Sequence, residues 1–116
     1  MTFAMRSLII LSLLIVSVCT SAQTVTMITG TYTTGKSDGI YLGKFDLGTG
    51  NYASISSVKG IKNPSFLCFG KNRQYVYAVS EANGGGNGGK VFAYAFDMVA
   101  GQLKKINEQP SGGDDP

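Results

Sequence analysis

Ile40-Tyr41-Leu42-Gly43-Lys44-Phe45-Asp46-Leu47 is followed, 51 residues later, by Val91-Phe92-Ala93-Tyr94-Ala95-Phe96-Asp97-Met98. The same offset relates Gly50-Asn51-Tyr52 to Gly101-Gln102-Leu103, and one residue later in register Asp115-Pro116 answers Asn63-Pro64. Each copy has the pattern of a strand, a turn and a second strand. A repeat of about 50 residues built from strands is typical of a propeller array. Because one full repeat cannot close such a ring, the sequence predicts the opening segment of a longer protein.

Short strands separated by turn residues are predicted throughout the chain after residue 22, and no stretch there has helical periodicity. The predicted strands are Val25–Thr33, Ile40–Leu47, Tyr52–Val58, Ser65–Phe69, Tyr75–Glu81, Val91–Asp97 and Leu103–Gln109. The last four make one complete propeller blade. The first three match the outer strands of a preceding, closing blade, which lacks its innermost strand. The expected fold class is therefore all-β, with antiparallel four-stranded blades of a β-propeller.

The first 22 residues are predicted to be a signal peptide. Arg6 supplies a basic start, residues 8–18 form an apolar run, and Thr20-Ser21-Ala22 offers the small residues that a signal peptidase needs. The run is shorter than the roughly 20 apolar residues of a membrane-spanning helix. A retained anchor and lipidation at Cys19 are the alternatives, although the bulky Val18 does not suit a lipoprotein signal. Cleavage would leave a propeller segment over residues 23–116, periplasmic or secreted and without a membrane span.

The composition argues against several classes of function. The net charge of +3 is small and no basic cluster alternates with aromatic residues, so nucleic acid is not an expected partner. The chain has no histidine, which removes the commonest general base and metal ligand from this segment. After cleavage Cys68 would be the remaining cysteine, and its apolar strand predicts a buried, inert thiol without a disulfide. We expect no cofactor and no metal site here.

One apparent motif is better explained by the strand pattern. Residues 30–37 read GTYTTGKS and match the phosphate-binding pattern G-x-x-x-x-G-K-[ST]. A phosphate-binding loop of that kind opens directly into a helix within a parallel βαβ unit. Here Asp38-Gly39 and a repeated strand follow instead. We therefore interpret residues 35–39 as a hairpin loop and not as a nucleotide site.

Six segments in order resemble the lactonase family of seven-bladed β-propellers, which includes bacterial 6-phosphogluconolactonase. They are Gly30–Thr33 with Gly39–Tyr41, Phe45-Asp46 with Gly50, Asn63–Leu67, Tyr75–Glu81, Val91–Asp97 with Gly101–Leu103, and Gln109–Gly113. The likeness covers residues 25–116, about the first quarter of a family member. It implies a hydrolase whose substrate is a small-molecule sugar lactone. The family's charged and histidine catalytic groups belong to later blades, so the resemblance places no catalytic residue in this segment.

Candidate substrate-facing residues lie on one face of the predicted blades, where the longer, polar and glycine-rich loops gather. Glu81 ends a strand there and is a candidate base or sugar-hydroxyl acceptor; the alternative is a solvated rim residue. Asn63 either presents its amide to the channel mouth or only starts an Asn-Pro turn. The remaining candidates are loop residues: Lys36, Ser37 and Asn83. For Lys36 and Ser37 a solvated hairpin tip is the simpler interpretation.

The other recurring side chains have structural interpretations. Alternation along the strands predicts that the repeated aromatic residues pack between blades: Tyr41, Phe45, Phe92 and Phe96. Asp46 and Asp97 precede the turns on the opposite face and are expected to bond the local backbone.

Two functions stay open at this stage. The first is an exported, 6-phosphogluconolactonase-like lactone hydrolase of which this chain is the N-terminal part. The alternative is a non-catalytic propeller that binds a carbohydrate or a protein on the same face. The segment alone would expose apolar sheet faces and unpaired strand edges, so we expect it to be poorly soluble and inactive.

Overall fold

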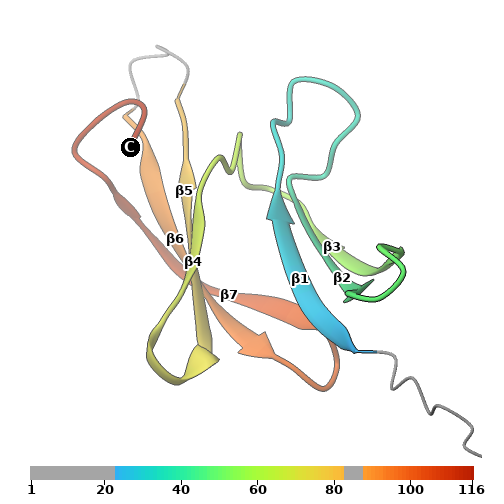
Figure 1. Cartoon of the computed structure of the whole chain (residues 1–116). Coiled ribbons are helices and arrows are strands. Elements are labelled where there is room, and N and C mark those ends of the chain that lie inside the picture. The colour runs from blue at the N-terminus through green and yellow to red at the C-terminus, as the bar shows by residue number, and fades with distance from the viewer. Residues whose placement is uncertain (1–22, 83–87) are drawn as a thin grey trace, which may run out of the picture.

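The computed structural model describes residues 23–82 and 88–116, which form two antiparallel sheets facing each other (Figure 1). The first sheet has the order β1 (Thr24–Gly30), β2 (Ile40–Asp46) and β3 (Tyr52–Val58). The second has the order β4 (Leu67–Phe69), β5 (Tyr75–Ser80), β6 (Lys90–Asp97) and β7 (Gln102–Pro110). The all-β prediction is confirmed, as are the three-stranded first sheet and the four-stranded second one. The predicted signal peptide lies outside the described residues.

The sequence repeat is also a repeat of backbone irregularities. In the β2–β3 hairpin the register shifts between Leu42 and Gly43, so that Ile55 is skipped in the pairing. In the β6–β7 hairpin the shift falls between Ala93 and Tyr94, and Ile106 is skipped. Each bulge adds one residue to the outer strand at the same place in the repeat. The two hairpins therefore correspond residue by residue at the 51-residue offset.

The hydrophobic core lies between the two sheets. The first sheet and the segment after it contribute Ile40, Leu42 and Ile61, all at most 2% exposed. The second sheet contributes Val76, Ala78, Phe92 and Tyr94 from its facing side. In each strand these residues alternate with residues on the outer face, as the pleat requires. The core is thus a blade-to-blade interface, which fits the predicted packing role of Phe92; Phe96 packs at its edge.

The repeated aromatic residues of the first copy, Tyr41 and Phe45, do not lie between the two sheets as Phe92 and Phe96 do. Tyr41 and Phe45 are half-buried on the face of the first sheet that points away from the second. The Tyr41 hydroxyl accepts a hydrogen bond from the Asp38 backbone N–H at 2.9 Å. These two residues therefore occupy the predicted packing face, but no second blade covers it among the described residues.

Three local expectations need correction. The first strand ends at Gly30 instead of Thr33, because the Thr33 N–H donates to Asn63 Oδ1 at 2.9 Å and not to β2. The turn after β4 contains an unpredicted 3-10 segment, η1 (Lys71–Arg73). Cys68 is exposed and not buried, because it lies on the outer face of the second sheet, opposite Tyr77.

Residues 31–39, all of which are described, contain no helix, so residues 35–39 form a loop as predicted, and residues 31–33, predicted as strand, belong to the same loop. In the part of the chain that the structure describes, no helix is both long and apolar enough to cross a membrane.

Candidate functional site

Glu81 lies where β5 ends, and its carboxylate joins the two sheets. The Tyr32 hydroxyl, from the β1–β2 loop, donates to Glu81 Oε2 at 2.7 Å. The Ser65 side chain, just before β4, also hydrogen-bonds to this carboxylate. The Ser65 bond first and the Tyr32 bond second hold the pKa of Glu81 below its ordinary value. The same contact with Glu81 raises the pKa of Tyr32, so the pair consists of an ionised carboxylate and a neutral phenol at neutral pH.

Asn63 is fully buried and serves as an internal brace. Its Oδ1 accepts hydrogen bonds from Thr33 N at 2.9 Å and Thr33 Oγ1 at 3.1 Å. Its backbone has a φ of 44°, a left-handed conformation that asparagine tolerates better than most residues. Its backbone carbonyl accepts a hydrogen bond from Glu81 N at 3.4 Å. The structure thus brings Asn63 close to Glu81, but the Asn63 side chain faces inward and not toward an open mouth.

The other candidates are not brought to Glu81. Lys36 is an exposed residue of the β1–β2 loop. The Ser37 hydroxyl is used within that loop: it contacts Thr31 Oγ1 and accepts a hydrogen bond from Gly39 N at 3.2 Å. Asn83 lies outside the described residues. The loop-tip interpretation therefore fits Lys36 and Ser37 better than a substrate role.

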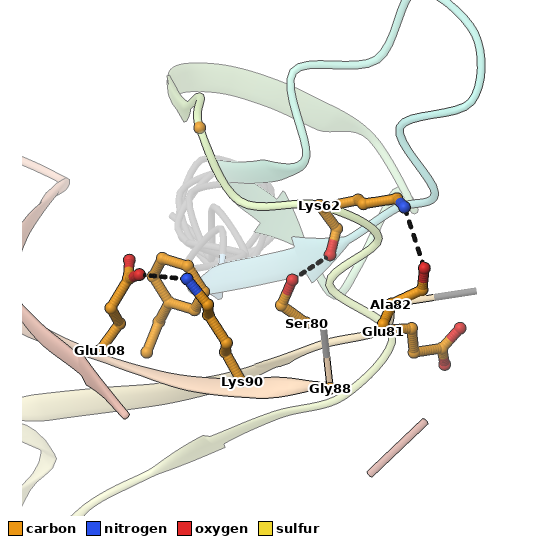
Figure 2. A pocket seen from close by; sticks show the side chains of 9 residues that line it. Lys62, Ser80, Glu81, Ala82, Gly88, Lys90 and Glu108 are labelled. Carbon is orange, nitrogen blue, oxygen red and sulfur yellow. Dashed lines mark hydrogen bonds and ion pairs between the residues drawn. The ribbon is translucent and has the colours of Figure 1, made fainter. Parts of the chain in front are cut away.

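A cavity of about 340 Å³ opens beside Glu81, between the β3–β4 segment and the second sheet (Figure 2). Ser80 Oγ donates to the Lys62 carbonyl at 2.6 Å, and Lys62 Nζ donates to the Ala82 carbonyl at 3.0 Å. Figure 2 shows the Glu81 carboxylate turned away from the ion pair on the other side of the cavity. The cavity and the Tyr32–Glu81 pair are therefore neighbouring features at the loop end of the blades.

The far wall of the cavity carries a charge cluster centred on Glu108. Lys90 Nζ lies 2.6 Å from Glu108 Oε1, and Lys105 Nζ binds Glu108 Oε2. The hydrogen bonds from Lys105 and Lys90 lower the pKa of Glu108 from 4.5 to about 2. Lys105 also lies 4.7 Å from the centre of the Phe92 ring, which fits a cation–π contact. The cluster ties the β6–β7 hairpin together at this end.

The described residues offer hydrogen bonding more than acid–base chemistry. Within residues 23–82 and 88–116, no three His, Cys, Asp or Glu side chains come together as a metal site would require. Glu81, Tyr32 and Ser65 can accept from and donate to sugar hydroxyls. Tyr32 and Ser65 were not among the sequence candidates. Both residues lie beside predicted strand ends on the same face as Glu81, which was the signal that the sequence offered. Their contact with Glu81 joins two sheets, so the pattern of a single strand does not predict it.

The described chain matches the family described as "Lactonase, 7-bladed beta-propeller" over residues 26–116. The chain therefore belongs to the lactonase family of β-propellers. It is 37% identical over 91 residues to the 6-phosphogluconolactonase of Formosa agariphila, covering 78% of this chain and 26% of that protein. The 6-phosphogluconolactonase of Bacillus subtilis is 36% identical over 89 residues, covering 75% of this chain and 24% of that one.

Solved structures agree in fold. A candidate 6-phosphogluconolactonase from Bacteroides fragilis is 36% identical with a TM-score of 0.73, covering 84% of this chain and 26% of that chain. The periplasmic gluconolactonase of Pseudomonas aeruginosa is 31% identical with a TM-score of 0.66, covering 74% of this chain and 24% of that one. The chain spans about a quarter of the length of the curated relatives that it matches.

Proposed function

We propose that this chain forms the N-terminal part of an exported lactonase-family propeller that opens a sugar lactone, and that it is inactive alone. Membership of the family supports the reaction type, and the relatives described as 6-phosphogluconolactonases support a sugar lactone as the substrate class. The similarity to a periplasmic gluconolactonase is compatible with export and with an unphosphorylated ring.

The observation that carries a role for this segment is the Tyr32–Glu81–Ser65 cluster. An ideal general base has a pKa near the operating pH, whereas hydrogen bonds lower the pKa of Glu81. Glu81 therefore suits the task of accepting a hydrogen bond from a substrate hydroxyl, and Tyr32 sets its direction. In this proposal the activated water and the oxyanion-stabilising groups come from other blades, and the present segment orients the sugar ring.

The test is a chimera in which residues 24–116 replace the matching first quarter of the Formosa agariphila 6-phosphogluconolactonase. Opening of 6-phosphogluconolactone and of gluconolactone is measured against spontaneous hydrolysis. We expect activity toward at least one of these lactones. Glu81→Gln should raise KM about five- to tenfold with a smaller change in kcat, because one hydrogen bond to bound substrate weakens.

Two further results give the experiment its controls. Tyr32→Phe keeps the charge of Glu81 and removes one partner, so it should raise KM less than Glu81→Gln does. A chimera that folds as a single species but opens no sugar lactone would favour the alternative, a carbohydrate- or protein-binding propeller. A Glu81→Gln chimera that loses kcat with KM unchanged would instead assign Glu81 to the chemical step.

A further inference from the structure

The cavity between the two sheets carries charges that the repeated fold does not require. On its far wall Lys90 and Glu108 form an ion pair. At the 51-residue offset these two residues correspond to Gly39 and Ser57 in the first copy. The β2–β3 hairpin has the same pairing and the same bulge without any such pair. The charged wall is therefore available for a role other than building the hairpin.

Both walls of this cavity belong to the described chain (Figure 2). One wall is the β3–β4 segment with Lys62, and the other is the second sheet with Ser80, Lys90 and Glu108. Its volume of about 340 Å³ lies at the lower end of the range for small-molecule sites. A ligand held here would be small and would contact both sheets.

The far wall has an excess of positive charge. The Glu108 carboxylate is shared by two ammonium groups, with Lys90 on Oε1 and Lys105 on Oε2. Two cations and one anion leave this group of three side chains with a net charge of +1. Its lysines and carboxylate lie side by side, so the wall offers donors and an acceptor to adjacent hydroxyl groups.

The opposite wall adds a second positive charge. Lys62 Nζ donates to the neutral Ala82 carbonyl at 3.0 Å, and the ion pairs of the described residues do not include Lys62. Glu81 also borders the cavity, but Figure 2 shows its carboxylate turned away from the far wall. The charges that face the cavity therefore favour a small anion, and Lys62 is the cation with no acidic partner to compete for it.

The remaining lining groups suit a ligand with hydroxyls and a carbon skeleton. Ser80 Oγ gives its hydrogen to the Lys62 carbonyl at 2.6 Å, so its oxygen keeps lone pairs for a ligand hydroxyl. Phe92 supplies an aromatic part of the wall. The lysine ammonium of Lys62 has three donors, of which the Ala82 carbonyl takes one. A carboxylate can accept the others.

We propose that this cavity binds a small polyhydroxy carboxylate, a sugar acid, with its carboxylate on Lys62 and its hydroxyls on Ser80 and the Lys90–Glu108 pair. The assignment stands on the lining of the cavity alone. Opening of a sugar lactone yields an acid of this class, so the proposed reaction would supply the ligand, and only that link rests on the proposed function.

The test is a titration of the whole chain with gluconate, followed by ligand-observed NMR, which needs little protein. Sorbitol is the neutral probe, because it has the hydroxyls without the carboxylate. Lys62→Met removes the proposed carboxylate partner and Lys62→Arg keeps its charge. Lys104→Met is the matched control, since Lys104 is an exposed lysine of β7 outside the cavity lining. Circular dichroism checks the fold of each variant, and the chimera with the remaining blades is titrated in the same way.

We expect saturable binding of gluconate and none of sorbitol. Lys62→Met should weaken binding about tenfold, the scale of one lost hydrogen bond to a charged group. Lys104→Met should change it less than twofold, Lys62→Arg should retain most of it, and added salt should weaken it. Glu81→Gln should leave it unchanged, because that carboxylate is turned away from the far wall.

Three results would overturn the proposal: no binding of gluconate, equal binding of sorbitol, or a Lys62→Met variant that binds as the Lys104→Met control does. A loss on Glu81→Gln as large as on Lys62→Met would also overturn it, by placing the acid at the Tyr32–Glu81–Ser65 cluster. A chimera that opens no lactone but shows the expected binding pattern removes the proposed reaction and leaves this site standing. An active chimera without the pattern removes the site alone.

Discussion

At the scale of single residues, Asn63 connects the loop after β1 with the residue that follows β5. Asn63→Ala would leave the Thr33 N–H without its acceptor beneath the loop. We expect the free energy of unfolding to fall by about 2 kcal/mol, within the range for an orphaned buried donor. Asn72→Ala is the control, since Asn72 also has a positive φ of 64° but is exposed in the η1 turn. Equal losses in urea titrations of dilute chain would show that backbone strain, and not the hydrogen bonds, explains the cost.

Glu108 gives the fold a pH dependence whose sign can be worked out. Two lysines lower its pKa in the folded chain to about 2 from an ordinary 4.5, so the folded state binds this proton less readily than the unfolded state. The stabilisation is complete above pH 4.5 and is lost as the pH falls toward 2. Glu108→Gln should therefore make the melting temperature less dependent on pH between about 2 and 4.5. Lys105→Met should move the loss to higher pH; a wild-type profile that matches Glu108→Gln would contradict the assignment.

At the scale of elements, the two hairpin turns are built alike. Asp46 Oδ1 accepts from Gly48 N at 2.8 Å and Thr49 N at 2.9 Å, and Asp97 Oδ1 accepts from the Val99 and Ala100 N–H groups. The prediction of turn-starting acids is thus confirmed. Replacing Asp46 by Ala should cost about 1 kcal/mol, the scale of a lost capping side chain. Asp46→Asn keeps the acceptor oxygen and should cost less than half as much in the same unfolding titration; equal costs would argue against these bonds.

How well the sequence predicts a strand or a buried residue depends on how far apart in the sequence the contacting residues are. Strand alternation and turn residues predicted β2, β3 and β6 closely, because those signals are local. The end of β1 at Gly30 and the burial of Asn63 were not predicted, since both depend on a bond between residues 30 positions apart. The Tyr32–Glu81 bond, 49 positions apart, was missed for the same reason. Cys68 was misplaced because an apolar strand does not reveal which of its faces has a partner.

At the scale of the whole molecule, each sheet leaves the outer edges of its two edge strands unpaired among the described residues. β2 and β6, the two copies of the sequence repeat, each lie between two neighbouring strands. β1 pairs with β2 alone and, like the other edge strands β3, β4 and β7, keeps one edge unpaired among the described residues. The repeat therefore falls, in each sheet, on a strand that is paired on both sides, as β5 also is in the second sheet.

The proposed function predicts that residues 23–116 alone open no sugar lactone. Tyr32 is 54% exposed and Glu81 faces solvent, so water competes for every hydrogen bond that would orient a substrate. The chain also contains no histidine, and hydrogen bonds lower the pKa values of Asp38, Asp46, Glu81 and Glu108. We expect the rate of gluconolactone opening with the chain to equal the spontaneous rate, while the chimera with the remaining blades exceeds it. A dilute, monomeric chain that accelerates lactone opening, and loses that activity on Glu81→Gln, would show instead that one blade and a partial blade already form a working site.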